Sequence, residues 1–465
     1  MIQNLNEDKK ELFANMPVKQ ALYVMAVPTI ISQLVNLIYN IVDAFFIGRT
    51  GNSYMVAATT ITLTLYMMNV ALANLFGIGG GSLVARLMGA EQTDKAKNVS
   101  SFCVYGTILI TLIYSFLVWF YMEPLLRFLG ASNETIGYAS VYTFYVIVIG
   151  SLPCVLALSL SHLLRNVGFA SQASYGLSGG GILNVVLDPV FMFYIMPKGQ
   201  EVTGAAFATL ISNVISCLYL SYFYYKATKT ASLSMNLSKA FKIDLVNIKS
   251  VFSVGIPSAA LPGLFDLANI CVGILSAAHN DLVLAGMGIV MKVERIPNAI
   301  NIGISQGMLP IVAYNYSSGN HERMKNVINA ARKMGLHVSL YCILFFIFLA
   351  RHICGVFMNT TASESEMALT TIAYATLFLR IRCLAAPVQF MNFHTSFCMQ
   401  AMGEGGKTLL HAIVREIVFY IPFMFILDKY FGEKGLAAAL PVGEACGAAF
   451  ALWLLHLTIS KLIKA

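Results

Sequence analysis

Twelve long apolar stretches divide this chain of 465 residues. A helix needs about 20 apolar residues to cross a hydrocarbon layer, and each stretch reaches that length. The stretches are too long and too uniformly apolar for strands, and several contain the glycines and prolines that packed membrane helices tolerate. The expected fold is therefore that of an all-α membrane protein. The twelve predicted spans are residues 19–43, 54–77, 99–121, 136–158, 163–193, 203–225, 250–276, 282–310, 327–350, 367–388, 394–426 and 435–460.

The composition excludes a soluble protein. Charged residues make up only 11% of the chain, against about 25% in soluble globular proteins, so an ordinary cytosolic enzyme is not expected. The net charge of +8 comes from short runs between apolar stretches and not from one basic stripe, so the expected partner is the lipid bilayer and not nucleic acid. The nine cysteines are scattered singly without a CxxC pair, which indicates neither a disulfide framework nor a zinc site.

Lys and Arg are distributed unequally between alternate loops. With the N-terminus inside, 21 of the 30 Lys and Arg residues fall in inside segments and six in outside loops, while Lys292, Arg295 and Arg415 lie within spans. Because positive residues are enriched on the cytoplasmic side, this predicts a multi-pass protein with both termini in the cytoplasm. The first 18 residues are polar, so the first span is expected to be retained rather than cleaved as a signal peptide.

The two halves of the chain resemble each other. Lys97-Asn98-Val99 recurs 228 residues later as Lys325-Asn326-Val327, and Gly79 pairs with Gly307 at the same offset. Six spans is an even number, so the two copies point the same way and are related by an axis along the membrane normal. Such paired bundles enclose a central cavity that can open to either side, as in transporters. The predicted division is an N-lobe at 1–225 (spans 1–6), a cytoplasmic linker at 226–249 and a C-lobe at 250–465 (spans 7–12).

Two carboxylates in the first half form the main candidate site. A charge at the bilayer centre costs about 2.5–3.5 kcal/mol on insertion scales. Each charged residue within a span is therefore expected to have a structural or functional role. Asp43 ends the first span and Asp188 lies late in the fifth, and each follows a polar residue on the same helix face, Tyr39 and Asn184. A carboxyl group that is desolvated and near a second one can take up a proton near neutral pH, or hold Na⁺ with other oxygens. The alternative is that Asp43 only faces water at its helix end.

Two further residues are candidates with open alternatives. Pro28 lies in the middle of the first span, where it removes a backbone hydrogen bond. It is either a hinge that lets the helix bend when Asp43 changes charge, or a static kink. Asp266, on the seventh span, is either a second cation or substrate site or a buried Asp paired with a neighbouring Asn or Arg.

The remaining intramembrane charges are expected to pair with one another. Glu294 lies between two cations and is expected in an ion-pair cluster. Arg415 and Glu416 are expected to pair with other spans, and Glu444 has no obvious partner in the sequence.

Motifs of soluble enzymes carry little weight in this chain. Ala401–Thr408 reads A-x-x-x-x-G-K-T, formally a phosphate-binding loop. That chemistry needs a preceding strand and a following helix in an α/β domain, whereas the flanks here are membrane spans. The eight histidines show no metal-ligand spacing, and no Ser/His/Asp set stands out. Neither a cofactor nor an enzymatic activity is therefore expected.

Several longer motifs resemble one transporter family. Asn40-Ile41-Val42-Asp43-Ala44-Phe45-Phe46-Ile47-Gly48 closes the first span. Leu164-Arg165-Asn166-Val167-Gly168 opens the fifth span, and Asn184-Val185-Val186-Leu187-Asp188-Pro189 lies within it. Gly303-Ile304-Ser305-Gln306-Gly307, followed by Pro310 and Tyr314-Asn315-Tyr316, ends the eighth span. Together these motifs resemble the multidrug and toxic compound extrusion (MATE) family over essentially the whole chain, and the last resembles its MepA-like branch.

The resemblance implies a V-shaped cleft between two lobes and a role for Pro28 in bending the first helix. The chain departs from the branch at Ser161-His162, where Asn is usual. Another branch carries its key carboxylate on the seventh span, about one residue from Asp266. By resemblance, H⁺ or Na⁺ couples transport, and Na⁺ would be held by Asp43, Asn184 and Asp188. The implied N-lobe cation and proton network comprises Tyr39, Asp43, Tyr142 or Tyr145, Asn184 and Asp188.

These observations predict a cation-coupled antiporter that exports lipophilic organic cations by alternating access. It is expected to act as a monomer in a bacterial cytoplasmic membrane, with no cofactor besides the coupling ion. One alternative is a lipid-linked saccharide flippase of the same superfamily, whose cavity should be cationic. Intramembrane carboxylates outnumber cations six to three here, which argues against it. A membrane-embedded enzyme, the second alternative, would need a convergent catalytic set.

Overall fold

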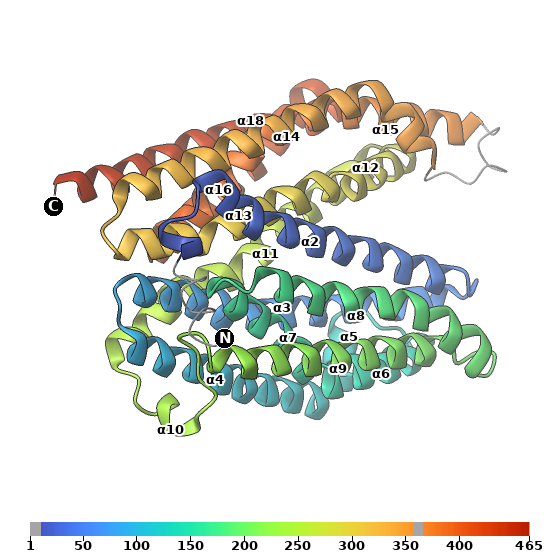
Figure 1. The fold of residues 1–465 in the computed structure, drawn as a ribbon. Helices are drawn as coiled ribbons and strands as arrows, with labels where there is room; N and C mark the ends of the chain where they lie inside the picture. The colour runs from blue at the N-terminus through green and yellow to red at the C-terminus, as the bar shows by residue number, and fades with distance from the viewer. Residues whose placement is uncertain (1–10, 357–365, 465) are drawn as a thin grey trace.

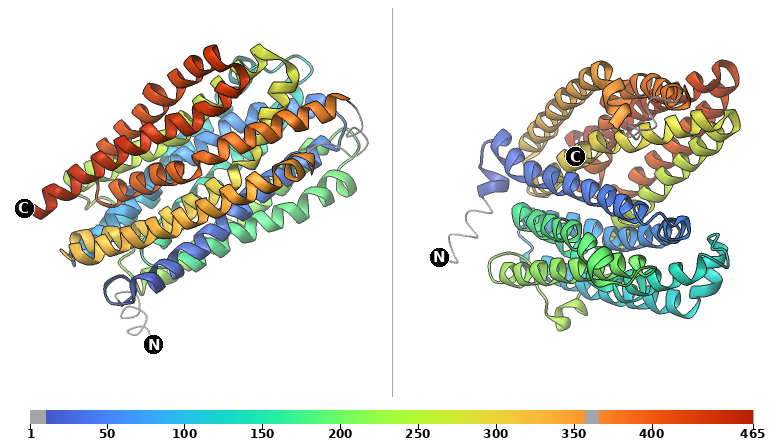
Figure 2. Two further views of the ribbon diagram at one scale, coloured as in Figure 1. Left: turned by 90° about the horizontal axis from the view of Figure 1, so that it is seen from above. Right: turned by 90° about the vertical axis from the view of Figure 1, so that its right-hand side faces the viewer.

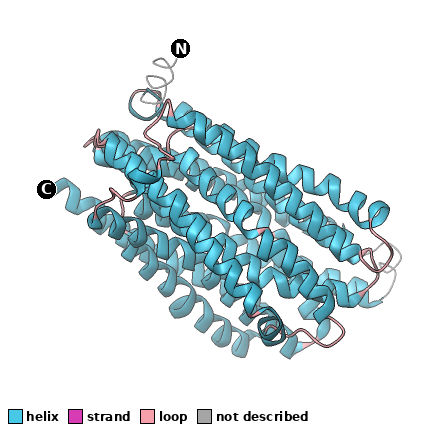
Figure 3. Ribbon diagram, turned by 90° about the horizontal axis from the view of Figure 1, so that it is seen from below, coloured by secondary structure: helices cyan, strands magenta, loops and turns pink. Residues whose placement is uncertain are grey.

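The chain forms a bundle of helices that run side by side along one axis (Figures 1 and 2). The computed structural model describes residues 11–356 and 366–464, and every regular element in these ranges is helical (Figure 3). The start of α2 (Val18–Gly48) and the end of α18 (Ile421–Lys464) lie at the same end of the bundle. The prediction of an all-α fold is confirmed.

The first half of the chain ends with α9, and the short helix α10 (Leu237–Ala240) connects it to the second half. Three short stretches of π-helix, η1, η2 and η4, interrupt the α-helices. In the first half the elements are α2 (Val18–Gly48), α3 (Ser53–Gly89), α4 (Thr93–Phe120), α5 (Met122–Phe128), α6 (Ile136–Thr143), η1 (Phe144–Ile149), α7 (Ser151–Asn166), α8 (Ala170–Val190), η2 (Phe191–Ile195) and α9 (Glu201–Thr228).

The second half begins at α11. Asp244 caps the start of this helix, because its side chain accepts a hydrogen bond from the Asn247 backbone amide at 2.7 Å. Its elements are α11 (Leu245–His279), α12 (Asp281–Val293), α13 (Arg295–Ser317), α14 (His321–Val356), α15 (Glu366–Arg382), η3 (Cys383–Ala385), α16 (Ala386–Ala401), α17 (Gly405–Ile413), η4 (Val414–Tyr420) and α18 (Ile421–Lys464).

These helices account for the twelve predicted crossings. Within the described ranges, nine helical segments are long and apolar enough to cross a membrane, or ten with the bent pair Ile136–Ile149 and Ser151–Asn166. The segment Gly405–Ser460 has 56 residues, about 84 Å at helical rise. It makes two crossings, because the chain turns back at Gly432 (φ 60°) and α18 packs against η4. The consecutive helices α12 and α13 form the remaining crossing.

Two predicted spans begin too early in the sequence, within the helix that precedes each of them. The fifth span begins at Ala170 and not at residue 163, because α7 continues to Asn166 and Gly168 (φ 90°) makes the turn. The eleventh begins at Gly405 and not at 394, because residues 394–401 belong to α16 and Gly403 (φ 83°) makes the turn. Glycine adopts these left-handed conformations without a steric penalty. Hydropathy detects neither break because both turns are short.

Helix α2 lies between the two groups of helices (Figures 1 and 2). It packs against α13 of the second half and against α8 of the first. The contact with α13 is near Ala26 and Ile30, whereas the contact with α8 is near Val35 and Tyr39. Gln33 still donates to Gln306 of α13, so the change of neighbour lies between Gln33 and Val35, more than one helical turn after Pro28.

The two halves meet mainly near the end of the bundle where α2 begins. Glycines permit the close approach: a Cβ atom on Gly79 of α3 would collide with the α11 backbone at Val251 and Gly255, and one on Gly307 of α13 would collide with Ala26 of α2. The hydrogen bonds between helices of the two halves include Gln33 to Gln306 (3.0 Å), Asn74 to the Ser258 carbonyl (3.3 Å), Ser82 to the Gln400 carbonyl (2.6 Å) and Arg86 to Ser250 (3.2 Å).

A methyl group at Gly79 is expected to weaken this junction. Gly79→Ala should lower the free energy of unfolding by about 1–3 kcal/mol, as overpacking does in tight cores, because the obstacle is backbone that cannot turn aside. Gly137→Ala is the matched control, since a Cβ atom there meets nothing within 4 Å. Thermal unfolding of both variants in detergent checks this. Equal midpoints for the two would contradict the close-packing account.

Candidate functional site

Helices of the first half bring polar side chains to one pocket and to a pair of carboxylates beside it. From α2, Asn36 and Tyr39 line the pocket and Asp43 lies beside it; the three share a face because they lie three and four residues apart. From α8, Asn184 lines the pocket and Asp188 lies one helical turn further on. From α9 comes Thr209, beside Asn184.

Small residues on α8 bring these helices close together. A Cβ atom on Gly180 would collide with Ser216 of α9, and one on Gly181 would press on Tyr39 and Val35 of α2. Gly180 and Gly181 therefore let α9 and α2 approach α8 from two sides.

The two carboxylates lie near each other with oxygens that have no partner. Asp188 is fully buried, and its Oδ1 accepts a hydrogen bond from Asn184 Nδ2 at 3.1 Å. Its Oδ2, the Oδ1 of Asp43 and the Oδ1 of Asn184 are buried and unpaired in the described structure. Asp43 and Asp188 are close enough to interact electrostatically. No Lys or Arg in the described ranges forms an ion pair with either carboxylate.

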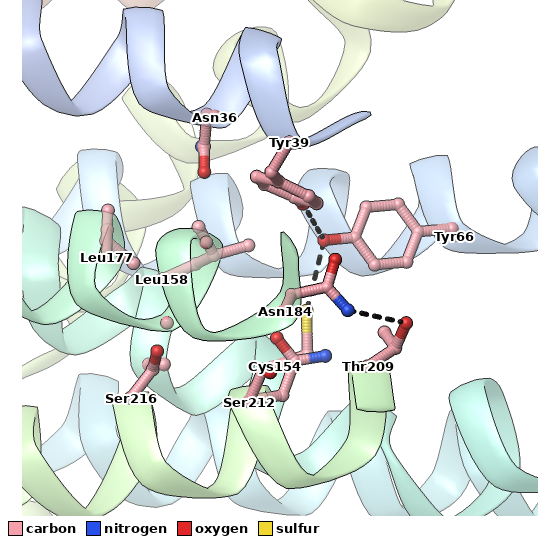
Figure 4. Close-up of a pocket in the computed structure, with 14 residues that line it drawn as sticks. Asn36, Tyr39, Tyr66, Cys154, Leu158, Leu177, Asn184, Thr209, Ser212 and Ser216 are labelled. Carbon is pink, nitrogen blue, oxygen red and sulfur yellow. Dashed lines mark hydrogen bonds between the residues drawn. The ribbon is translucent and has the colours of Figure 1, made fainter. Parts of the chain in front are cut away.

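A chain of weaker contacts surrounds the pocket (Figure 4). The hydroxyl of Tyr39 lies 3.3 Å from that of Tyr66 on α3, and the Cys154 thiol of α7 donates to the Tyr66 hydroxyl at 3.6 Å. Asn184 Nδ2 also donates to Thr209 Oγ1 at 3.4 Å. The pocket has a cavity volume of about 50 Å³, and its lining contains no charged side chain.

Of the two candidate tyrosines on the fourth span, Tyr142 is the one beside the carboxylates. It is buried and interacts with Asp43, Asp188 and Thr209. Tyr145 instead packs its ring against Phe207, with ring centroids 4.4 Å apart. One helical turn thus separates a tyrosine at the site from one in the apolar packing.

The pocket contains residues that the sequence analysis missed. Tyr66 gave no signal, because nothing in the sequence distinguishes it from the other polar residues of its span, such as Thr62 and Asn69. The α9 residues did carry a signal, since their spacing of three, one and three places them on one helix face. They are Thr209, Ser212, Asn213 and Ser216.

Ser161-His162, where the chain departs from the MepA-like pattern, lies outside this pocket. The His162 ring packs against Gly77 of α3, and its Nδ1 lies 3.4 Å from Arg165 Nη1. Arg165 in turn lies 3.5 Å from Gln306 of α13. The departure therefore affects the junction between the halves and not the lining of the pocket.

The candidate residues of the second half lie in other surroundings. Asp266 interacts with Asn269 and Arg295, which favours the paired-Asp alternative. Glu294 pairs with Arg382, with Oε1 2.8 Å from Nε and Oε2 2.8 Å from Nη2, and not with its sequence neighbours.

The Gly406-Lys407-Thr408 motif lies in the first turn of α17, flanked by helices and not by a strand. The Lys407 ammonium donates to Thr458 at 2.8 Å and pairs with Glu404 at 3.1 Å. A lysine held in this way is part of helix packing.

The unpaired oxygens of Asp43, Asn184 and Asp188 at and beside the pocket suit a proton or a small hard cation. No cluster of three or more His, Cys, Asp and Glu side chains gathers anywhere in the described ranges. A metal ion here would rely on the two carboxylates and neutral oxygens such as those of Asn184 and Thr209. Carboxylate and amide oxygens are ligands for hard cations and not for zinc or copper. The donor set therefore fits Na⁺, and a single proton shared by Asp43 and Asp188 fits equally.

Comparison with known proteins gives a consistent result over the whole chain. The sequence model of the MatE family matches residues 28–190 and 263–426. The multidrug export proteins MepA of Staphylococcus saprophyticus and of Staphylococcus aureus (strain MRSA252) are each 28% identical over 458 residues, which is 98% of this chain and 98% of each relative.

Solved structures match the fold. A crystal structure of MATE in complex with MaL6 has a TM-score of 0.91 and 23% identity, covering 98% of this chain and 99% of that one. An outward-facing multidrug resistance MATE family transporter of the MOP superfamily has a TM-score of 0.88 and 24% identity, covering 98% of both chains. The predicted arrangement of twelve transmembrane helices in two lobes is confirmed.

The hydroxyl of Thr209 is expected to hold Asn184 in place. Thr209→Val keeps the shape but removes the acceptor at Asn184 Nδ2, so it should cost about 1 kcal/mol of unfolding free energy, as loss of one buried hydrogen bond does. Thr60→Val is the control on the exposed face of α3 and should change stability by less than about 0.5 kcal/mol. Denaturation in detergent measures both. A Thr209→Val variant as stable as wild type would argue against this contact.

Proposed function

Because the chain belongs to the MatE family, we propose that it is a cation-coupled multidrug antiporter that exports lipophilic organic cations by alternating access. Its family and its relatives, multidrug export proteins, make it a membrane transporter and not an enzyme. The name of the MepA relatives supports multidrug export. The coupling ion of the proposal is H⁺ or Na⁺.

The observation that carries the proposal is a pair of carboxylates without a cationic partner, Asp188 fully buried and Asp43 half-buried with a buried Oδ1. A buried charge is stable only when it is paired and hydrogen-bonded. Asp43 and Asp188 have no such cation among the described residues, and each keeps an unpaired oxygen. Their charge is therefore best neutralised by a ligand that comes and goes: a proton, Na⁺ or a cationic substrate.

Competition for this charge provides the coupling. When an organic cation occupies the cleft, Asp43 and Asp188 attract it electrostatically, and aromatic side chains add cation–π attraction. An inward-moving H⁺ or Na⁺ that binds at Asp43, Asp188 and Asn184 removes this attraction and releases the drug outward. The gradient of H⁺ or Na⁺ then drives the export of the organic cation, and no nucleotide is hydrolysed.

The contacts between the two halves support a state of the transport cycle that is closed to the cytoplasm. We place both termini in the cytoplasm of a bacterial cell, because most Lys and Arg residues lie on that side. The contacts near Gly79 and Gly307 then close the cytoplasmic end, and the state is closed to the cytoplasm. The lobes of this proposal are residues 1–225 and 250–465 with the linker 226–249 between them. One chain holds both lobes, so a monomer suffices.

Pro28 is the proposed hinge. The contact of α2 with α13 of the other half extends across Pro28 from Ala26 to Gln33, and the contact with α8 beside the carboxylates follows at Val35 and Tyr39. Pro28 cannot donate a hydrogen bond to the preceding turn, so α2 bends there at little cost. A change of charge at Asp43 thereby alters the packing of α2 against the junction.

The flippase alternative has less support. Lipid-linked saccharides carry pyrophosphate, which needs cations in the cavity. The pocket described above is lined by neutral polar side chains, with two carboxylates beside it and without Lys or Arg. This lining suits a cationic substrate.

Replacing Asp43 should abolish coupled transport. In liposomes loaded with a fluorescent lipophilic cation, wild type is expected to move the dye when a pH gradient or a Na⁺ gradient is imposed alone, and the effective gradient names the ion. Asp43→Asn should lose most of this activity, because a neutral amide cannot exchange a cation. Asp94→Asn, at a carboxylate whose side chain is 93% exposed, is the control and should transport normally.

Two results would contradict different parts of the proposal, one the exported substrate and the other the coupling site. If neither gradient moves the dye in wild type, export of such cations is the wrong function. If Asp43→Asn transports as well as wild type, antiport stands and the coupling site lies elsewhere, with Asp188 and Asp266 the next to replace.

Straightening α2 should slow transport without unfolding the protein. Pro28→Ala restores a backbone donor in the helix, so its unfolding midpoint should equal or exceed that of wild type. Its dye transport should fall severalfold if bending at this position is part of the cycle. Pro124→Ala in the short helix α5, where the proline is exposed, should leave transport unchanged. Normal transport by Pro28→Ala would make the proline a static kink.

A further inference from the structure

A second buried network of charges lies in the other half of the chain. It joins Arg415 and Glu416 of η4 to Glu444 of α18 and Asn392 of α16, and all four residues are at most 5% exposed. The nearby pair of Glu294 and Arg382 approaches it through Tyr420, whose hydroxyl accepts from Arg382 Nη1 at 3.3 Å. None of these residues belongs to the pocket beside Asp43 and Asp188.

Two of the three glutamates in this network are neutralised by arginine. Glu294 receives two hydrogen bonds from Arg382, each of 2.8 Å. Glu444 receives two from Arg415, of which Nε to Oε2 measures 2.9 Å, and a further one from Asn392 Nδ2. Such two-point pairs are the geometry in which guanidinium and carboxylate charges balance.

Glu416 is the glutamate left without a cation of its own. Its Oε1 lies 3.5 Å from Arg415 Nε, but that nitrogen already donates to Glu444. Its Oε2 is buried with no hydrogen-bond partner among the described residues, and the whole residue is 4% exposed. Three carboxylates thus face two guanidinium groups, so one negative charge would stay uncompensated inside the membrane.

The other groups around the network do not supply the missing charge. His411 of α17 contacts Asn392 Oδ1 through Nε2 and Ser396 Oγ through Nδ1, both at 3.0 Å. Asn392 uses its amide nitrogen on Glu444, so its Oδ1 accepts the His411 proton, and Ser396 can donate to Nδ1 as to a neutral ring. Tyr420 is neutral, and Asp266 of α11 interacts with Asn269 and Arg295 instead.

A proton suits this position better than a metal ion. Arg415 lies next to Glu416 and would repel a metal cation, while a single free carboxylate oxygen offers few ligands. A proton removes the charge and also turns Glu416 into a donor. Glu416 lies in the π-helical stretch η4, and single π-helical turns in α-helices often mark functional sites.

We propose that Glu416 is a second proton-exchange site of this transporter, protonated in the state described and located in the opposite lobe from Asp43 and Asp188. Its proton is released when Glu416 gains a cationic partner or water as the lobes rearrange. Glu294 and Glu444 are then structural, because each has its own arginine. The part of this proton in transport rests on the proposed antiport, whereas its presence on Glu416 does not.

Infrared spectroscopy tests the presence of the proton directly. Purified protein carrying ¹³C-carboxyl glutamate should show a protonated glutamate band at neutral pH, shifted by the label away from aspartate bands. The band should disappear on titration to high pH and be absent at neutral pH in Glu416→Gln. Glu123→Gln, at a side chain 64% exposed and paired with Arg127, is the control and should keep the band. No such band in wild type, or a band that persists in Glu416→Gln, would overturn the proposal.

Proton counting tests its role in transport. In proteoliposomes, Glu416→Gln should take up one proton fewer per dye molecule exported than wild type. An unchanged count, or a Glu416 band that does not respond to pH, would make the proton a structural one and overturn exchange. If wild type exports no dye, the antiport proposal fails, and the infrared band still decides whether Glu416 exchanges a proton. If Glu416→Gln does not fold, Glu416→Asp serves instead, since its band moves to the unlabelled aspartate position.

Discussion

Every carboxylate inside the membrane must be neutralised, and the two halves of this protein meet that requirement in different ways. In the second half, Arg382 and Arg415 hold Glu294 and Glu444 through paired hydrogen bonds. In the first half, Asp43 and Asp188 have no basic partner in the described ranges and share only neutral neighbours. A fixed partner makes a rigid core, whereas a missing partner makes a site that an ion or substrate can occupy.

The position of α2 connects that site to the junction between the lobes. One helix contacts α13 along its first half and α8 along its second, with Pro28 before the change. A helix shared by two bodies transmits a change at one contact to the other. Glycines at the junction make the contact close, and glycines on α8 make the pocket close. The same physical device, the missing side chain, therefore serves both the closed end and the site.

Much of the site could be predicted because helical spacing is regular. Tyr39 with Asp43 and Asn184 with Asp188 follow from residues four positions apart on helices that the hydropathy pattern already indicates. Tyr66 could not be predicted, because nothing in an apolar span shows which of its faces meets another helix. The choice between Tyr142 and Tyr145 was open for the same reason. Glu444 lacked a partner in the sequence because Arg415 belongs to a different crossing and meets it only in the folded bundle.

The sequence by itself determined the helical membrane fold, the twelve crossings and the two copies, because water cannot satisfy backbone groups in hydrocarbon and only helices or closed barrels remain. It also determined which carboxylates lie within the membrane, since charge is rare there. Only the tertiary structure decided which of them have partners. That outcome depends on contacts between helices far apart in the chain, at distances of about 3 Å, and spacing along one helix carries no information about them.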